Sequence, residues 1–210
     1  MSRARQSLPA NMDILREVAN VAAAHAATAL SQLTDRTIMI TVPDLLLAPL
    51  TEVPGSLAAY AHNVLSVEMR ILGQVQGRIL YMMPQRDARF LADFLLGRAS
   101  LQEDSADGLT ESCLQETANI LGGAYTSALA RMTGRDVMLS VPRLRVGDLL
   151  DLLAGTGADD PTPDEYAFCV ATSFHLGAIH PELEGRLLLV SDSGSLATLI
   201  EAVRITAGQV

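Results

Sequence analysis

The feature that most constrains this chain is an internal repeat at an interval of 99 residues. Segments 13–43 and 112–142 are identical at 11 of 31 positions. A chain of 210 residues that arose by duplication is expected to fold as two similar halves. The predicted repeats span about 11–97 and 110–205, and together they form a single domain over residues 1–210.

A second correspondence extends the repeat along the chain. Residues 63–84 match residues 169–191 around two Gly-Arg steps, Gly77-Arg78 and Gly185-Arg186. In each half an apolar run follows the step and leads into an amphipathic segment, "RDARFLADFLLG" or "GSLATLIEAV". Each half therefore predicts the order helix, strand, loop, two strands joined by a turn, and helix.

One such half would leave a sheet edge unpaired, which natural proteins avoid. The two halves are therefore expected to share a single, mostly antiparallel sheet that is flanked by helices and has pseudo-twofold symmetry. The predicted fold class is α+β, with two long helices that carry the repeated motif.

The segment that opens each repeat predicts a helix of about 23 residues, or roughly 34 Å. Asn11 and Thr110 are placed to cap the two helices. One side of each helix is apolar and is expected to face the core. The apolar positions are Leu15, Val18, Ala22, Ala29 and Leu33 in the first helix, and Leu114, Leu121, Ala128 and Met132 in the second.

The opposite side of each helix carries a carboxylate and an amide three residues apart. These are Glu17 and Asn20 in the first repeat, and Glu116 and Asn119 in the second. At this spacing the side chains are neighbours, with Cβ atoms about 5–6 Å apart. Asn is a poor residue for a helix interior, yet both repeats keep it while neighbouring surface positions have changed. The retained pair indicates a functional site.

Small residues flank the two pairs, namely Ala23, Ala24, Ala27, Gly122 and Gly123. Two adjacent glycines in a helix cost on the order of 1–2 kcal/mol relative to alanine. Close approach of another surface to the helix backbone would offset that cost.

Other polar or reactive residues favour structural roles. His25 corresponds to Ala124, so the repeat does not require an imidazole, and we interpret His25 as a packed or boundary residue. Cys113 resembles a small core hydrophobe. Pro43 and Pro142 are expected to end strands and to direct the following loops.

Composition excludes several classes of function. The net charge of -9 and the absence of a Lys/Arg cluster argue against a nucleic-acid surface. No apolar run approaches the roughly 18 residues of a membrane span, and no signal peptide is evident. Two cysteines, Cys113 and Cys169, suit a reduced, cytoplasmic protein. No metal-ligand spacing is present, so no metal is expected on this chain.

A Glu–Asn pair cannot form a nucleophile–base system of the Ser-His type. The amide can donate and accept hydrogen bonds, which suits it to orienting an attacking water. The carboxylate can pair with a cation on a partner and fix how the partner docks. Such a site would be completed by another protein that holds the phosphoryl group, a lysine and Mg²⁺.

The pattern Asp/Ser-x₃-Glu-x₂-Asn-x₂₂-Pro occurs twice and resembles the CheC/CheX/FliY family of response-regulator phosphatases from chemotaxis. The resemblance covers nearly the whole chain, and two copies in one chain are most similar to the CheC type. The matching residues are Asp13, Glu17, Asn20 and Pro43, and Ser112, Glu116, Asn119 and Pro142.

The resemblance implies an enzyme that hydrolyses the aspartyl phosphate of a CheY-like receiver, with one site in each half. The two asparagines would orient the water, and the two glutamates would pair with a receiver lysine. Asp13 and Ser112 would support the first turn of each site. Mg²⁺ would belong to the receiver.

Two alternatives remain open from the sequence. The chain could be a regulatory binding protein for the receptor deamidase CheD, or a flagellar-switch adaptor of the FliY kind. The adaptor is less favoured, because that form carries a further C-terminal domain and this chain ends at Val210. The chain also departs from the family at Ala19 and Ala118, where glycine is common, and at His25; the two methyl groups are expected to alter docking slightly.

Overall fold

The structure is a computed structural model that describes residues 8–73, 77–98, 108–134, 136–154, 165–177 and 182–195. The predicted helix "GSLATLIEAV" and the end of the second repeat fall largely outside the described residues. The elements, in chain order, are α2 (Leu8–Thr34), β1 (Ile38–Thr41), β2 (Leu45–Pro49), η1 (Leu50–Glu52), α3 (Val53–Ser56), η2 (Ala58–Tyr60), β3 (Val64–Gly73), β4 (Gly77–Pro84), α4 (Gln85–Leu96), α5 (Gly108–Thr133), β5 (Val137–Leu139), β6 (Arg143–Gly147), α6 (Leu149–Leu153), β7 (Glu165–Leu176) and β8 (Leu183–Asp192).

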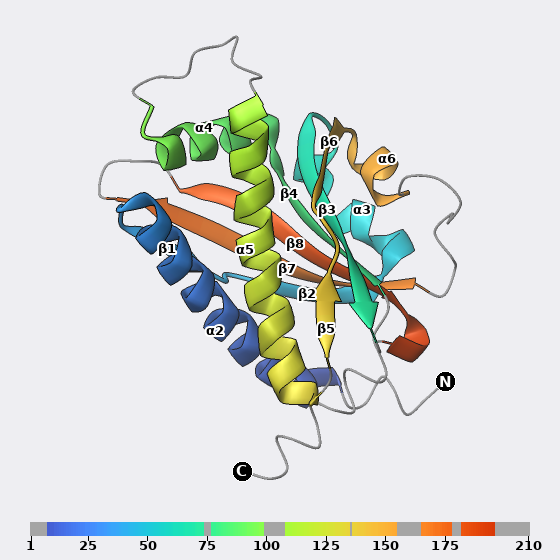
Figure 1. The fold of residues 1–210 in the computed structure, drawn as a ribbon. Coiled ribbons are helices and arrows are strands. Elements are labelled where there is room, and N and C mark those ends of the chain that lie inside the picture. Colours follow the sequence, from blue (N-terminus) through green and yellow to red (C-terminus); the bar gives the residue numbers. More distant parts are fainter. Residues whose placement is uncertain are drawn as a thin grey trace.

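The strands form one sheet in the order β1-β7-β8-β4-β3-β5, with β2 also paired to β7 and β6 also paired to β3. All of these pairings are antiparallel. The strands that follow each long helix pair with the hairpin of the other half, so β1 and β2 join β7, and β5 and β6 join β3 (Figure 1). The predicted shared antiparallel sheet is confirmed.

The pseudo-twofold axis lies at the centre of the sheet, in the β4–β8 ladder. Leu80 pairs there with Leu188, and each is the third residue after the glycine of its Gly-Arg step. Equivalent residues of the two repeats therefore face each other. The arginines of the two steps, Arg78 and Arg186, lie at opposite ends of the same ladder.

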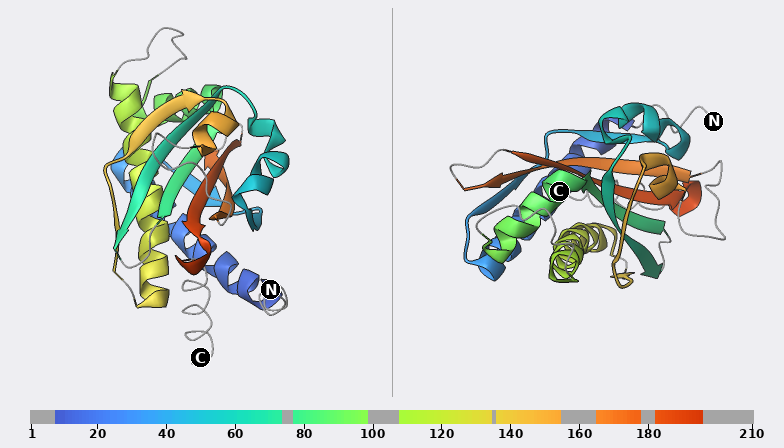
Figure 2. Two further views of the ribbon diagram at one scale, coloured as in Figure 1. Left: turned by 90° about the vertical axis from the view of Figure 1, so that its right-hand side faces the viewer. Right: turned by 90° about the horizontal axis from the view of Figure 1, so that it is seen from above.

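Helices cover both faces of the sheet, because successive strand residues point to opposite sides. Ile79, Tyr81 and Met83 pack in the core that includes α2, α4 and α5. Leu80 and Met82 pack on the other face, in a core that includes α3 and α6. Figure 2 shows α5 and α3 on opposite sides of the sheet.

The two Gly-Arg steps have a packing role. The Arg78 guanidinium donates a hydrogen bond from Nη2 to the carbonyl of Leu153, at the end of α6, over 2.8 Å. The Arg186 guanidinium lies 4.9 Å from the centroid of the Tyr60 ring, in η2. Each arginine thus holds a short helical segment against the sheet.

Glycine precedes each arginine because a side chain would not fit there. A Cβ atom on Gly185 would lie 2.6 Å from Tyr81 Oη and 2.9 Å from Thr172 Oγ1. On Gly77 it would collide with the carbonyl oxygen of Val190. The repeated Gly-Arg step therefore reflects close packing of the central strands.

The two long helices begin earlier than the sequence indicated. Helix α2 has 27 residues and α5 has 26, so Asn11 and Thr110 lie inside the first turns. The prediction that they are capping residues is wrong. Thr110 is buried, and its hydroxyl accepts a hydrogen bond from Arg98 Nη1 over 3.0 Å. This contact to the segment after α4 gives the threonine a structural role of its own.

Most of the predicted apolar stripe faces the core. Leu33 is the exception, with 66% of its surface exposed in the last turn of α2, and the prediction for it is wrong. Ala29 is half-buried, and the side chain of Met132 lies outside the described residues. The buried members are Leu15, Val18, Ala22, Leu114, Leu121 and Ala128. No helix in the described part of the chain is long and apolar enough to span a membrane.

Candidate functional site

The Glu–Asn pair stands on the outer surface of each long helix. Glu17 and Asn20 are exposed on α2, and Glu116 and Asn119 are exposed on α5. Among the residues that the structure describes, none forms a hydrogen bond or an ion pair with any of these four side chains. The carboxylates and amides are therefore available to a partner.

The residues between the members of each pair anchor the helix. Val18 and Ala19 are buried between Glu17 and Asn20, at 7% and 0% exposure. At the corresponding place in α5, Thr117 is 2% exposed and its hydroxyl donates to the carbonyl of Cys113 over 2.8 Å. Because the buried side of each helix is packed against the core, the side chains on its exposed side are held in a defined orientation.

The residues that precede the pairs are also exposed. Asp13 and Ser112 lie one turn before Glu17 and Glu116. The Ser112 hydroxyl donates to the carbonyl of Gly108 over 2.7 Å, within the first turn of α5. This hydrogen bond occupies one of the carbonyls at the start of the helix.

The two prolines of the repeated pattern lie in the connections between strands. Pro43 sits between β1 and β2, and Pro142 sits between β5 and β6. Each follows a strand, as the sequence predicted, and separates it from the next strand.

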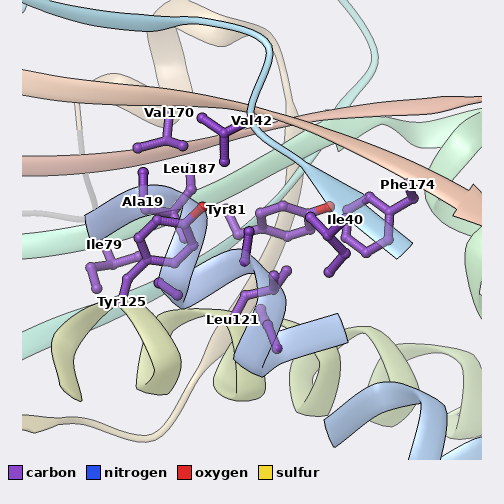
Figure 3. Packing of buried hydrophobic residues seen from close by; sticks show 14 of the residues in the cluster. Ala19, Ile40, Val42, Ile79, Tyr81, Leu121, Tyr125, Val170, Phe174 and Leu187 are labelled. Carbon is purple, nitrogen blue, oxygen red and sulfur yellow. The ribbon is translucent and has the colours of Figure 1, made fainter. Parts of the chain in front are cut away.

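Ala19 and Ala118, the two residues that differ from the family pattern, face the core and not the surface that carries the Glu–Asn pairs. Both residues are 0% exposed and belong to the core between the helices and the sheet. Figure 3 shows Ala19 among Ile79, Tyr125 and Leu187. The methyl groups of Ala19 and Ala118 therefore fill the core and do not lie on the exposed surface, and their effect on docking stays a prediction.

The small residues near the pairs divide into two groups. Ala24 is exposed, and a Cβ atom on Gly123 would have no atom within 4 Å. Ala23 and Ala27 are buried, because α2 packs against α5 as well as against β1. Gly122 is also buried. At these last three residues the surface that comes close to the helix backbone belongs to the protein itself.

The two adjacent glycines of α5 allow a direct test of this division. We expect Gly123→Ala to raise the free energy of unfolding by about 0.5–1 kcal/mol, because alanine is the better helix former and space is open. Gly122→Ala should bring no such gain, since its Cβ would lie 2.8 Å from Met69 Cε and 3.1 Å from Leu139 Cδ1. Urea unfolding of both variants measures the difference. Equal stabilisation by both would contradict this packing.

His25 and Cys113 differ in how well they fit the sequence interpretation. His25 is exposed, so the prediction of a packed or boundary histidine is wrong. Cys113 is half-buried against the core, and burial raises the pKa of its thiol. Cys169 is buried, and burial raises its thiol pKa to about 11. Both thiols therefore stay protonated near neutral pH, as expected of core residues.

Sequence reasoning missed part of the exposed face around each pair. Val21, next to Asn20, keeps 36% of its surface exposed. Its counterpart at the 99-residue interval is the half-buried Ile120, and exposed Thr28 corresponds to exposed Ser127. Comparing the two repeats could have identified these positions, because Val21 and Ile120 are both apolar and Thr28 and Ser127 both carry a hydroxyl group.

The exposed Glu–Asn pairs have the chemistry for binding and orientation. Within the described ranges, no group of three His, Cys, Asp or Glu side chains could hold a metal ion. An exposed amide and carboxylate one turn apart can order a water and pair with a cation. Both functions require a partner that supplies the reacting group.

Comparison with known proteins gives two family matches. Residues 11–47 match the CheC-like family, and residues 65–158 match the chemotaxis phosphatase CheX family. The CheY-P phosphatase CheC of Bacillus subtilis (strain 168) is 30% identical over 195 residues, which cover 91% of this chain and 93% of that protein. The flagellar motor switch phosphatase FliY of the same organism is 25% identical over 168 residues, covering 80% of this chain and 43% of that protein.

Solved structures show the same fold. The crystal structure of Thermotoga maritima FliY matches with a TM-score of 0.76 and 19% identity, covering 94% of this chain and 98% of that chain. The FliM middle domain from H. pylori matches with a TM-score of 0.66 and 9% identity, covering 92% and 98%. At these identities the likeness concerns the arrangement of helices and strands.

Proposed function

The chain belongs to the CheC/CheX/FliY family, and from this membership we propose that it hydrolyses the aspartyl phosphate of a CheY-like receiver. It is a homologue of the CheY-P phosphatase CheC, a protein aspartyl-phosphate phosphatase. The observation that carries the proposal for this chain is the exposed Glu–Asn pair on each long helix, whose side chains form no hydrogen bond or ion pair with any residue in the described ranges.

In this proposal the asparagines orient the attacking water. The side-chain amide of Asn20 or Asn119 enters the receiver's phosphorylated pocket and hydrogen-bonds the attacking water. The water is then held in line with the bond between phosphorus and the aspartyl oxygen. An acyl phosphate is already labile, so positioning the nucleophile is enough for a useful acceleration.

The glutamates hold the receiver in register. Glu17 or Glu116 pairs with a lysine of the receiver, one helical turn from the asparagine. Because the two side chains stand on one rigid helix, the ion pair also sets the depth at which the amide enters the pocket. Asp13 and Ser112 support the turn before each pair.

Magnesium is assigned to the receiver in this mechanism. Bound there, it would neutralise charge on the phosphoryl group, while this chain contributes the amide and the carboxylate. The site is therefore divided between two proteins, and the receiver alone loses its phosphoryl group only at its own, slower rate.

The proposal includes two sites for each chain, one in each predicted repeat. Its support is the matching exposure of the pairs on α2 and α5. The test is the release of inorganic phosphate from the phosphorylated cognate receiver. Added chain should shorten the lifetime of the phosphoryl group in proportion to its concentration; a lifetime that stays at the receiver's own value would exclude the function.

A further inference from the structure

The exposed face around each Glu–Asn pair extends beyond the pair toward the C-terminal end of the helix. Val21 lies four residues after Glu17 and beside Asn20, and Ala24 lies four residues after Asn20. Residues at this spacing are neighbours on a helix surface. On α2 the four side chains therefore form one continuous exposed patch.

The second repeat keeps the same patch by chemical type. Ile120 replaces Val21, and Gly123 replaces Ala24. Each copy thus combines a β-branched apolar residue with a very small residue directly beside the pair. The exposed position that follows the small residue has changed character, since His25 corresponds to Ala124.

The apolar member of the patch is only partly buried in each copy, and in the second copy Ile120 packs in part against the core. Val21 has 36% of its surface in solvent, and β-branched residues are weaker helix formers than the alanines around it. The small member leaves room, because a Cβ atom on Gly123 would meet nothing within 4 Å. An exposed apolar side chain beside open space suits contact with a second surface.

We propose that Val21 and Ile120 are specificity-determining residues that pack against an apolar surface of the receiver beside its phosphorylated pocket. Ala24 and Gly123 let the receiver approach the helix closely enough for this contact. The inference rests on the proposed function, because the patch is continuous with the Glu–Asn pair that the receiver engages. This contact adds to the affinity that the glutamate–lysine pairs provide, and the rate at saturation comes from the amides.

The test is the doubly substituted chain Val21→Thr with Ile120→Thr, which keeps the branch at Cβ and puts a hydroxyl in place of a methyl group at Val21 and of the ethyl group at Ile120. The receiver concentration at half-maximal rate should rise about tenfold, while the rate at saturation stays within about twofold. The matched control is Leu33→Thr, on the same helix and 66% exposed, which should change neither quantity. Circular dichroism checks that the variants fold.

A second variant, Ala24→Leu with Gly123→Leu, fills the open space. It should lose measurable binding to a receiver that carries a beryllofluoride mimic of the phosphoryl group. Unchanged half-saturation in the threonine variant, or unchanged binding in the leucine variant, would overturn the inference.

Binding to the beryllofluoride receiver also separates this inference from the proposed function. A wild-type chain that binds the receiver without speeding phosphate release would fail as a phosphatase, and the two patch variants would still decide the inference by binding. A wild-type chain that does not bind at all would overturn both.

Discussion

Replacing both Asn20 and Asn119 with alanine is expected to return phosphate release to the receiver's own rate. The amide is the only group in each pair that can both donate to and accept from a water, so its removal leaves the nucleophile unoriented. Loss of one oriented hydrogen-bonding group at a reacting centre costs about 10²–10³ in rate. The measurement is the first-order decay of the phosphorylated receiver at a saturating concentration of the chain.

The substitution should leave docking largely intact. Glu17 and Glu116 remain in place, so binding of a beryllofluoride-loaded receiver should weaken far less than the rate. The asparagines are exposed, and their side chains form no hydrogen bond with another described residue, so the variant should also unfold close to the wild-type temperature. Loss of the fold together with activity would point to a structural role and would count against the assignment.

Phe174→Ala is expected to destabilise the whole chain by about 3–5 kcal/mol. The ring is 0% exposed and packs edge-on against Tyr81, with 6.3 Å between the ring centroids. In the sheet Phe174 pairs with Ile40, on the strand that crosses from the first half, and with Leu183, on β8. Removing it leaves a cavity where the two halves join.

Because the halves exchange strands, we expect one cooperative unfolding transition in both the wild type and this variant. The melting temperature should fall by roughly 6–20 °C for a chain of this size. Leu150→Ala is the control, because Leu150 is 66% exposed and its truncation should cost little. Two separate transitions in calorimetry would contradict a single domain, and a cost below about 1 kcal/mol would contradict the packing at Phe174.

Most of what could be predicted from the sequence followed from the internal repeat. Equal spacing of the Glu–Asn pairs placed four side chains on the outside of two helices, where the structure has them. The need to close the sheet edge predicted a shared antiparallel sheet. Which strand pairs with which half was not predictable, because β1 and β5 could bond to either hairpin with the same local sequence.

The wrong predictions concern which residues of the two long helices are buried. Each of these helices packs against more than one element, so the spacing of apolar residues alone does not define its buried side. Ala23 and Ala27 are buried because α2 contacts both α5 and the sheet, which widens its buried arc. Gly122 and Gly123 are adjacent, but a turn of about 100° per residue sends one toward Met69 and the other into open space. The helical spacing of apolar residues predicted that Leu33 and His25 would be at least partly buried. Both are exposed, because no element of the described chain covers them.

The central claim is that each Glu–Asn pair is half of an active site that a phosphorylated receiver completes. The most direct measurement compares the decay rate of the phosphorylated receiver with the wild type, Asn20→Ala, Asn119→Ala and the double variant. We predict that each single variant keeps part of the acceleration, that the two parts add up to the wild-type value, and that the double variant shows none. Wild-type acceleration by the double variant would contradict the claim.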